Sequence, residues 1–302
     1  MGKMRSVTKQ TADLIRDSTT IGESKHEAKK NGTAKDGIFS FNSLNVHRPT
    51  WHRFASFCKE EFGLKDIQKV TPDMLREYLG KRAFNDDLSA KSYENECSRI
   101  GKFINALDVK RGVDVRELKA EWAECKKFIK ELRGEALFNR AYLDPKAMIR
   151  SIGDESCQLA GKLQFETGAR ISEISKLDRR NLNENYGEII LKNTKGGLER
   201  IGKLSPETYE KLLKIIEEKG QFRLNVRQYR LELREAALLC GDDAKGKSTH
   251  GFRYNFAQKK YFQFLAEGFV PELAKSEVSR LLGHKRIEIT NRYLKLEMLL
   301  AS

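Results

Sequence analysis

A small set of residues in the C-terminal half has the types and spacing that chemistry at a phosphate requires. Arg170 follows a glycine at the start of an expected helix, and His250 and Arg253 stand three residues apart near the start of another. His284 follows a Leu-Leu-Gly sequence, and Tyr293 comes nine residues later. The arginines can bind phosphate oxygens, the histidines can donate hydrogen bonds or move protons, and the tyrosine can act as a nucleophile.

A lysine in the same half can complete this set. Lys195 lies in a glycine-containing turn and could protonate a leaving oxygen, although Lys192 and Lys203 occupy the same segment. Each residue taken alone has a simpler explanation, such as a salt bridge from Arg170 to an acid or a half-buried packing tyrosine. The ordered set, and no single member of it, therefore indicates a site.

The elements that must position these residues follow from apolar periodicity and capping residues. In the N-terminal half, apolar residues at helical spacing predict four helices over roughly residues 40–134. Pro49 suits the first turn of one helix, Gly63 suits its end, and Ser89 suits the cap of another. The polar face of the helix after Ser89 carries Lys91, Asn95, Arg99 and Lys102. Taken alone, such a face is most simply solvated.

The chain is predicted to have four segments: a basic extension over 1–37, a helical domain over 38–134, a linker over 135–144 and a second domain over 145–302. The extension has few large apolar residues, which predicts a flexible or partly helical arm. In the second domain, which starts at the Asp144-Pro145 helix signal, two short apolar segments around a glycine-containing turn predict a β-hairpin over 188–204. The fold class is therefore mainly α with one small antiparallel sheet.

Length and composition limit the class of protein. The chain has 302 residues, of which 39% are hydrophobic, and its 57 Lys and Arg against 43 Asp and Glu give a net charge of +14. Intrinsic disorder is excluded, and the charge indicates a polyanionic partner, most simply nucleic acid. Without an apolar run of membrane-spanning length or an apolar signal segment, we expect no membrane partner and a cytoplasmic, DNA-associated location. No nucleotide-binding glycine loop or zinc pattern is present, so we expect no cofactor and no metal.

The motifs around these residues resemble those of the tyrosine recombinase family, which includes phage integrases and Xer-type recombinases. The matching segments read T-G-A-R-I-S-E-I, H-G-F-R and L-L-G-H, followed by the tyrosine near the C-terminus. In the N-terminal half, V-T-P-D-M-L-R-E-Y-L is similar to the family's core-binding domain. The resemblance implies a helical SAM-like core-binding domain followed by a mixed α/β catalytic domain with a small antiparallel sheet.

The same resemblance implies site-specific cleavage and rejoining of DNA through a covalent 3′-phosphotyrosine, without metal or ATP. Tyr293 would be the nucleophile, Arg170 and Arg253 would bind the phosphate oxygens, and Lys195 would protonate the leaving 5′-oxygen. His250 and His284 would donate hydrogen bonds or shuttle protons, and Glu173 would support the site without reacting. The candidate DNA-contacting residues are Lys91, Asn95, Arg99, Lys102, Lys192 and Arg200.

The expected partner is double-stranded DNA carrying a recombination site, bound by a homotetramer on two duplexes, with accessory proteins as further partners. A type IB topoisomerase would use the same residues as a monomer, and a basic architectural DNA-binding protein would need none of them. The compact two-domain layout and the Leu-Gly-His sequence favour the recombinase. Nine residues follow Tyr293, which is short for a segment exchanged between protomers and leaves the mode of exchange open.

Overall fold

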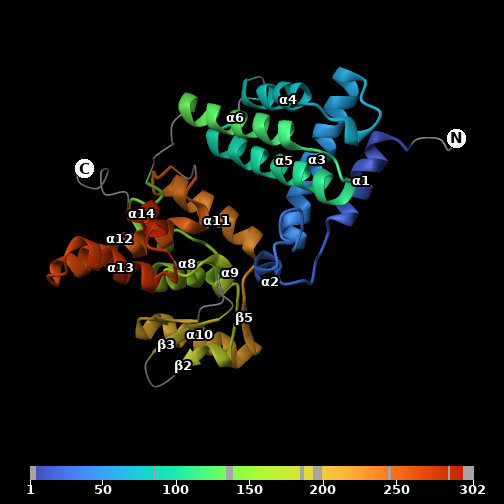
Figure 1. The fold of residues 1–302 in the computed structure, drawn as a ribbon. Helices are drawn as coiled ribbons and strands as arrows, with labels where there is room; N and C mark the ends of the chain where they lie inside the picture. The colour runs from blue at the N-terminus through green and yellow to red at the C-terminus, as the bar shows by residue number, and fades with distance from the viewer. Residues whose placement is uncertain are drawn as a thin grey trace. The chain divides into compact units, whose positions relative to one another are not determined.

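The computed structural model describes residues 5–84, 86, 88–133, 139–183, 187–192, 199–243, 246–284 and 286–294, and of 129–133 the backbone alone. The chain divides into two compact units, residues 1–136 and 137–302, called here the N-terminal and C-terminal units. Each unit is mainly helical (Figure 1). Among the described residues, no helix combines the length and apolar character needed to cross a membrane.

The named elements in the described part of the N-terminal unit are all helices, and one isolated parallel β-bridge joins Thr19 to Ile38. Its elements are α1 (Val7–Asp17), α2 (Lys25–Lys30), α3 (Phe41–Phe62), the 3₁₀ turn η1 (Ile67–Lys69), α4 (Pro72–Phe84), α5 (Ala90–Arg111) and α6 (Arg116–Arg133). Ser89 caps α5 as predicted, because its hydroxyl accepts a hydrogen bond from the Ser92 backbone N–H. Gly63 ends α3 as predicted, with the left-handed φ of 65° that glycine adopts without strain.

One prediction for this unit is wrong in detail. Pro49 does not open a helix: α3 begins at Phe41, capped by Ser40, and continues through the proline. The helix tolerates the lost backbone hydrogen bond because Leu44 and Trp51, on either side of Pro49, are buried in the same core. Of the two forms predicted for the N-terminal arm, flexible or partly helical, the structure has the helical one, since the buried apolar residues of α1 belong to that core and α1 packs against α3 and α5.

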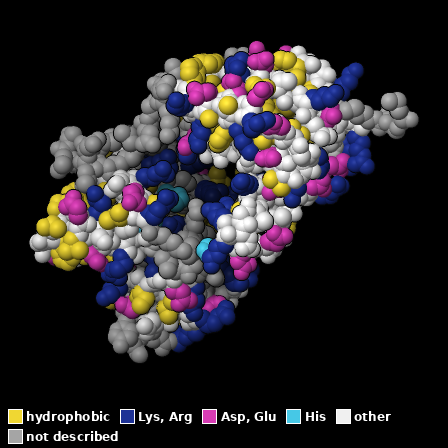
Figure 2. All heavy atoms as spheres, in the orientation of Figure 1, with side chains coloured by type: hydrophobic (Ala, Val, Ile, Leu, Met, Phe, Trp, Pro, Cys, Tyr) yellow, Lys and Arg dark blue, Asp and Glu magenta, His cyan; other side chains and the backbone are white. Residues whose placement is uncertain are grey.

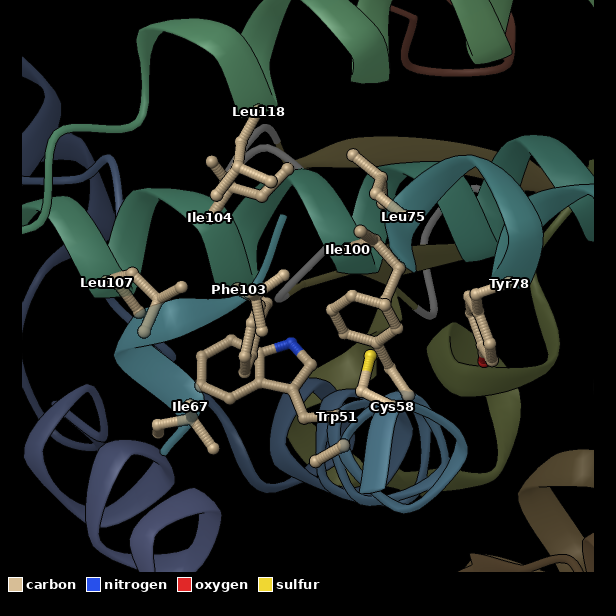
Figure 3. Close-up of a cluster of buried hydrophobic side chains, with 14 of the residues drawn as sticks. Trp51, Cys58, Ile67, Leu75, Tyr78, Ile100, Phe103, Ile104, Leu107 and Leu118 are labelled. Carbon is tan, nitrogen blue, oxygen red and sulfur yellow. The ribbon is translucent and has the colours of Figure 1, made fainter. Parts of the chain in front are cut away.

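Besides α1, helices α3, α4, α5 and α6 build the core of the N-terminal unit (Figure 3). Trp51 of α3 packs edge-on against Phe103 of α5, with ring centroids 5.5 Å apart, and its indole N–H donates to the Arg99 carbonyl at 3.0 Å. The predicted apolar stripe of α5 is buried throughout: Tyr93, Cys97, Ile100, Ile104 and Leu107. The opposite, polar face of α5 is thereby directed away from this core.

The C-terminal unit combines helices with two small antiparallel sheets. Its helices are α7 (Pro145–Arg150), α8 (Glu155–Thr167), α9 (Ile171–Ile174), α10 (Pro206–Lys219), α11 (Val226–Leu239), α12 (Gly251–Ala266), α13 (Pro271–Leu281) and α14 (Glu288–Leu294), with 3₁₀ turns η2 (Arg179–Asn181) and η4 (Ser248–His250). Its strands are β1 (Lys176–Asp178), β2 (Leu182–Asn183), β3 (Glu188–Leu191), β4 (Arg200–Lys203) and β5 (Gln221–Arg223).

The predicted hairpin is present as β3 paired with β4, and the predicted fold class, mainly α with a small antiparallel sheet, is confirmed. Two pairings were not predicted. Strand β2 extends the hairpin to three strands, and β1 pairs with β5 across more than forty residues of sequence. The tip of the hairpin, including Lys195, lies outside the described residues.

Helix α8 lies at the centre of the C-terminal unit and packs against α12, α10 and α7. Leu163 of α8 and Phe252 of α12 are fully buried in this core. Further along α12, Phe262 is 42% exposed, while the neighbouring Tyr261 is buried. The C-terminal ends of α8 and α13 meet the first turn of α12. Arg170, Arg253 and His284 lie at or directly after these three ends, and Tyr293 lies on α14.

Candidate active site

A forced turn at the end of α8 positions Arg170. Gly168 ends α8 with a φ of 63°, and a Cβ built there would lie 2.4 Å from the Phe256 ring. A left-handed backbone and close packing therefore both require glycine at this position. Two residues later, Arg170 is the N-cap of α9, which confirms the predicted helix start.

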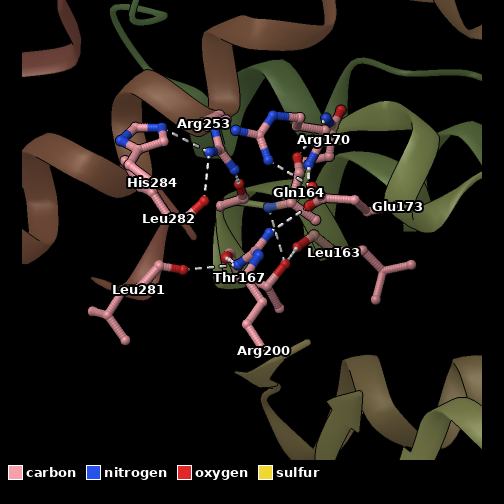
Figure 4. A network of polar contacts seen from close by, with 12 residues as sticks. Leu163, Gln164, Thr167, Arg170, Glu173, Arg200, Arg253, Leu281, Leu282 and His284 are labelled. Atoms are coloured by element: carbon pink, nitrogen blue, oxygen red, sulfur yellow. Dashed lines mark hydrogen bonds and ion pairs between the residues drawn. The ribbon is translucent and has the colours of Figure 1, made fainter. Parts of the chain in front are cut away.

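Glu173 holds two arginines at this turn. Its Oε1 accepts from Arg170 Nη1 at 2.7 Å, and its Oε2 accepts from Arg200 Nη2 at 2.6 Å (Figure 4). Its Oε2 also accepts from the Arg170 backbone N–H at 2.9 Å. Burial by itself raises the pKa of Glu173, but Arg200 and Arg170 outweigh it and the pKa lies below its ordinary value. The carboxylate is therefore ionised and fully used in holding the two guanidinium groups.

Arg253, on the first turn of α12, is fully buried. Its Nε faces the Tyr293 hydroxyl at 3.4 Å, its Nη2 lies 3.1 Å from His284 Nε2, and its guanidinium carbon lies 5.4 Å from the centre of the Tyr293 ring. Burial lowers the pKa of Arg253 to about 10, which still leaves the guanidinium charged at neutral pH. A buried cation thus stands beside the candidate nucleophile.

Arg200 and Arg253 bridge the same two helix ends (Figure 4). Each donates to one carbonyl at the end of α8 and to one at the end of α13. The acceptors are adjacent in sequence: Thr167 and Leu281 for Arg200, and Gly168 and Leu282 for Arg253. The last carbonyls of a helix have no backbone partner within the helix, and the helix C-terminus carries partial negative charge. The two guanidinium groups donate hydrogen bonds to these carbonyls and offset that charge.

Hydrogen bonds to its neighbours hold the His284 ring in one tautomer. Because Arg253 Nη2 is a donor, His284 Nε2 accepts, and its Nδ1 then donates to the Thr290 hydroxyl at 2.9 Å. Burial and the nearby Arg253 and Arg170 lower the pKa of His284 to about 3, so the ring is neutral at pH 7. The ring centroid lies 5.3 Å from that of Tyr293.

Tyr293 belongs to α14 and is 9% exposed. Its ring packs with centroids 4.6 Å from Tyr254, so the packing role expected of an isolated tyrosine is fulfilled as well. Its hydroxyl nevertheless points to Arg253. The structure therefore brings the candidate nucleophile against a cation that can bind the phosphate it would attack.

His250 is the N-cap of α12 and is exposed at the surface. Surrounding protein atoms, followed by the charges of Arg253 and Arg170, lower its pKa and favour the neutral ring. Figure 2 shows Lys and Arg side chains beside the histidines on the face that it draws, and such a concentration of positive charge attracts phosphate. Among the members of the set that the structure describes, His250 is the most open to solvent.

Of the predicted DNA-contacting residues, only Arg200 has a described contact with this cluster. Lys192, directly after β3, is exposed. On α5, Lys91 and Asn95 are exposed, Arg99 lies 3.5 Å from Glu96, and Lys102 donates to the Gly37 carbonyl. Arg200, predicted to contact DNA, is instead 8% exposed and bound inside the Glu173 network.

Sequence reasoning missed the place of Arg200 because it lacked the strand register. In the hairpin, Arg200 lies opposite the buried Leu191, while the next residue, Ile201, is 55% exposed. Side chains alternate between the faces of a strand, so this register places the arginine inside and the isoleucine outside. The position of Thr290 beside His284 was also missed, since a threonine six residues from a histidine carries no signal of its own.

Comparison with protein-family models finds a match to the phage integrase family over residues 146–299, just over half of the chain. This segment contains Arg170, Glu173, Arg253, His284 and Tyr293. The comparison with curated proteins found no match.

Solved structures with a similar fold include three protein–DNA complexes. The XerH site-specific recombinase bound to palindromic difH substrate, a post-cleavage complex, superposes with a TM-score of 0.68 and 16% identity, over 98% of this chain and 94% of that one. A lambda integrase dimer bound to a COC′ core site gives 0.61 and 16%, over 89% and 94%. The Tn1549 transposon integrase with a circular intermediate DNA gives 0.60 and 16%, over 95% and 94%. At this identity the likeness shows a shared fold.

Proposed function

The chain belongs to the phage integrase family, the tyrosine recombinases, and on this premise we propose that it cleaves and rejoins DNA at a specific site through a covalent 3′-phosphotyrosine on Tyr293. One observation carries the proposal. The buried Arg253 lies between the Tyr293 hydroxyl, at 3.4 Å, and His284 Nε2, at 3.1 Å. A phosphate that binds this guanidinium is brought within reach of the hydroxyl.

In the proposed step, Tyr293 Oη forms a bond to phosphorus while the bond from phosphorus to the 5′-oxygen breaks. One phosphodiester replaces another, so rejoining by a 5′-hydroxyl needs no nucleotide hydrolysis. Arg170 and Arg253 bind the non-bridging oxygens, where negative charge is concentrated in the transition state. Glu173 keeps Arg170 in place through two hydrogen bonds.

Protons must leave the tyrosine and reach the departing oxygen. His250 is proposed to accept the tyrosine proton, since its lowered pKa keeps the ring neutral at pH 7. His284 is proposed to hold Arg253 before the phosphate arrives and to hydrogen-bond a phosphate oxygen afterwards. Lys195, outside the described residues, is proposed to protonate the leaving 5′-oxygen.

The proposed partner is double-stranded DNA carrying a recombination site. The similar XerH, lambda and Tn1549 structures are each complexes with DNA. We propose that this chain acts likewise, as a tetramer on two duplexes, with accessory proteins setting direction. Phosphate contacts from exposed lysines and arginines would supply most of its affinity, in keeping with the net charge of +14.

The test is trapping of the covalent intermediate. Duplexes from the DNA that flanks the gene, labelled and nicked so that the released 5′-hydroxyl fragment diffuses away, are incubated with protein and run on SDS gels. Wild type is expected to give an SDS-resistant adduct at a 3′-phosphate, and Tyr293→Phe none. Tyr209→Phe is the matched control, because the buried Tyr209 hydroxyl has no hydrogen-bond partner among the described residues.

Each other outcome points elsewhere. An adduct from Tyr293→Phe would refute the nucleophile. Binding by wild type without any adduct would favour the architectural alternative. Adducts on arbitrary sequences, with relaxation of supercoiled plasmid by the monomer, would favour the topoisomerase.

A further inference from the structure

We infer that Arg200 is a positioning residue for strand cleavage, which fixes the segment carrying Arg170 relative to the segment carrying His284. The inference rests on the proposed function and concerns the same site. It replaces the sequence-based interpretation of Arg200 as a DNA contact.

The first step is the geometry of the guanidinium. Arg200 Nη1 donates to the Thr167 and Leu281 carbonyls, both at 2.9 Å, and Nη2 donates to Glu173 Oε2 at 2.6 Å. One side chain, anchored in β4, therefore joins the end of α8, the start of α9 and the end of α13. The side chain is 6% exposed, and both of its Nη atoms already donate to acceptors inside the protein.

The second step is what each contact controls. Glu173 also binds Arg170, both at its guanidinium and at its backbone N–H. On the other side, Leu281 immediately precedes Leu282, whose carbonyl accepts from Arg253 at 2.7 Å. Arg200 thus acts on Arg170 through Glu173. Its acceptor Leu281 is also the sequence neighbour of Leu282, the residue that accepts from Arg253.

The third step is the turn that leads to His284. Gly283 has a φ of 66°, and a Cβ built there would lie 3.2 Å from Arg200 Cδ. The stem of the arginine therefore forms the surface on which this turn packs. Arg200 contacts neither His284 nor Tyr293 in any described hydrogen bond or ring contact, which marks its action as indirect.

The fourth step is the cost of removing the charge. Burial lowers the pKa of Arg200, and the ionised Glu173 opposes this effect. Without the guanidinium, Glu173 keeps Arg170 as its remaining described cation partner, and two helix-end carbonyls lose a buried donor. In the variant, the Arg170 and Glu173 side chains can move together, and the end of α13 can move relative to α8.

The experiment measures the rate of adduct formation at saturating nicked DNA, together with DNA affinity and thermal unfolding. Arg200→Met removes the guanidinium group and its charge but keeps a long side chain. Arg200→Lys keeps the positive charge but lacks the planar guanidinium, which can donate to several acceptors at once. Arg223→Met is the matched control, an exposed arginine on strand β5 of the same unit. Glu173→Gln and the double variant with Arg200→Met test whether the effect passes through Glu173.

We expect Arg200→Met to slow adduct formation about 100-fold and Arg200→Lys about 10-fold, with affinity changed less than about threefold. The double variant should be no slower than the slower single one, since both changes release the same arginine. If Arg200→Met does not fold, Arg200→Lys decides, because its lower rate at unchanged affinity would support the same role. Arg223→Met should match wild type.

Three results would overturn the inference. An adduct rate within about threefold of wild type, with a lowered melting temperature only, would make Arg200 purely structural. Weaker binding with a salt dependence reduced by about one phosphate contact would return it to DNA binding. A wild type that forms no adduct would refute the proposed function and this inference together, whereas a wild-type adduct with an unchanged Arg200→Met rate refutes the inference alone.

Discussion

Replacing Gly168 by alanine should destabilise the C-terminal unit more than the same replacement at an uncrowded glycine. Gly168 has a φ of 63°, and its missing Cβ would lie 2.4 Å from one Phe256 ring carbon and 3.0 Å from a Leu282 methyl carbon. Gly220, which ends α10 in the same unit, has a φ of 73° and nothing within 4 Å of a Cβ. The two positions share backbone strain and differ in packing.

The magnitudes follow from these two contributions. Forcing alanine into the left-handed region costs about 1–2 kcal/mol at either glycine. Overpacking against a buried aromatic ring adds about 1–3 kcal/mol at Gly168 alone. The reduced freedom of the unfolded chain offsets about 0.4–1 kcal/mol equally in both variants. Gly168→Ala should therefore lose about 1–3 kcal/mol more than Gly220→Ala.

Urea unfolding followed by far-UV circular dichroism measures this difference. The chain has two tryptophans, Trp51 and Trp122, and both belong to the N-terminal unit, so their fluorescence follows that unit separately. The circular dichroism transition should move and the fluorescence transition should stay. Equal losses in the two variants would refute the argument, because backbone strain would then explain both.

Two further predictions concern pH and salt. Because the pKa of His284 is about 3 in the folded protein and about 6.5 when unfolded, the unfolded state binds more protons, so stability should fall from about pH 6.5 towards pH 3. Urea unfolding over this range should show a smaller loss for His284→Gln, and identical pH dependence would contradict the assignment. If the polar face of α5 contacts DNA, Lys91→Ala should reduce the slope of log affinity against log salt by about 0.9. The exposed Lys214→Ala on α10 should leave the slope unchanged, and an unchanged slope for Lys91→Ala would remove that lysine from the interface.

Signals that act over a few residues were read correctly from the sequence. Ser89 caps α5, Asp144 caps α7 with Pro145 after it, and Gly63 ends α3 in the left-handed region. Caps and left-handed glycines involve neighbours within one helical turn, so the local sequence contains the whole interaction. The hairpin was predicted for the same reason, from two apolar segments and a glycine-containing turn.

Pairings between distant segments were not predicted. Strand β1 pairs with β5, with Lys176 opposite Arg223, although three other strands and α10 lie between them in sequence. Helix α3 continues through Pro49 because buried neighbours on both sides outweigh one lost hydrogen bond. In both cases tertiary packing overrides the local preference.

The sequence by itself determined the chemical groups of the candidate site, since the motifs around Arg170, Arg253, His284 and Tyr293 are short and ordered. The sequence could not show which partner each arginine binds, because a buried arginine and an exposed one look the same in a sequence. Only the tertiary structure decided that Arg200 is buried, since its place depends on a strand register and on carbonyls from two distant helix ends. The two buried arginines differ in their partners, which are properties of the folded chain: Arg200 binds Glu173, whereas Arg253 faces the Tyr293 hydroxyl.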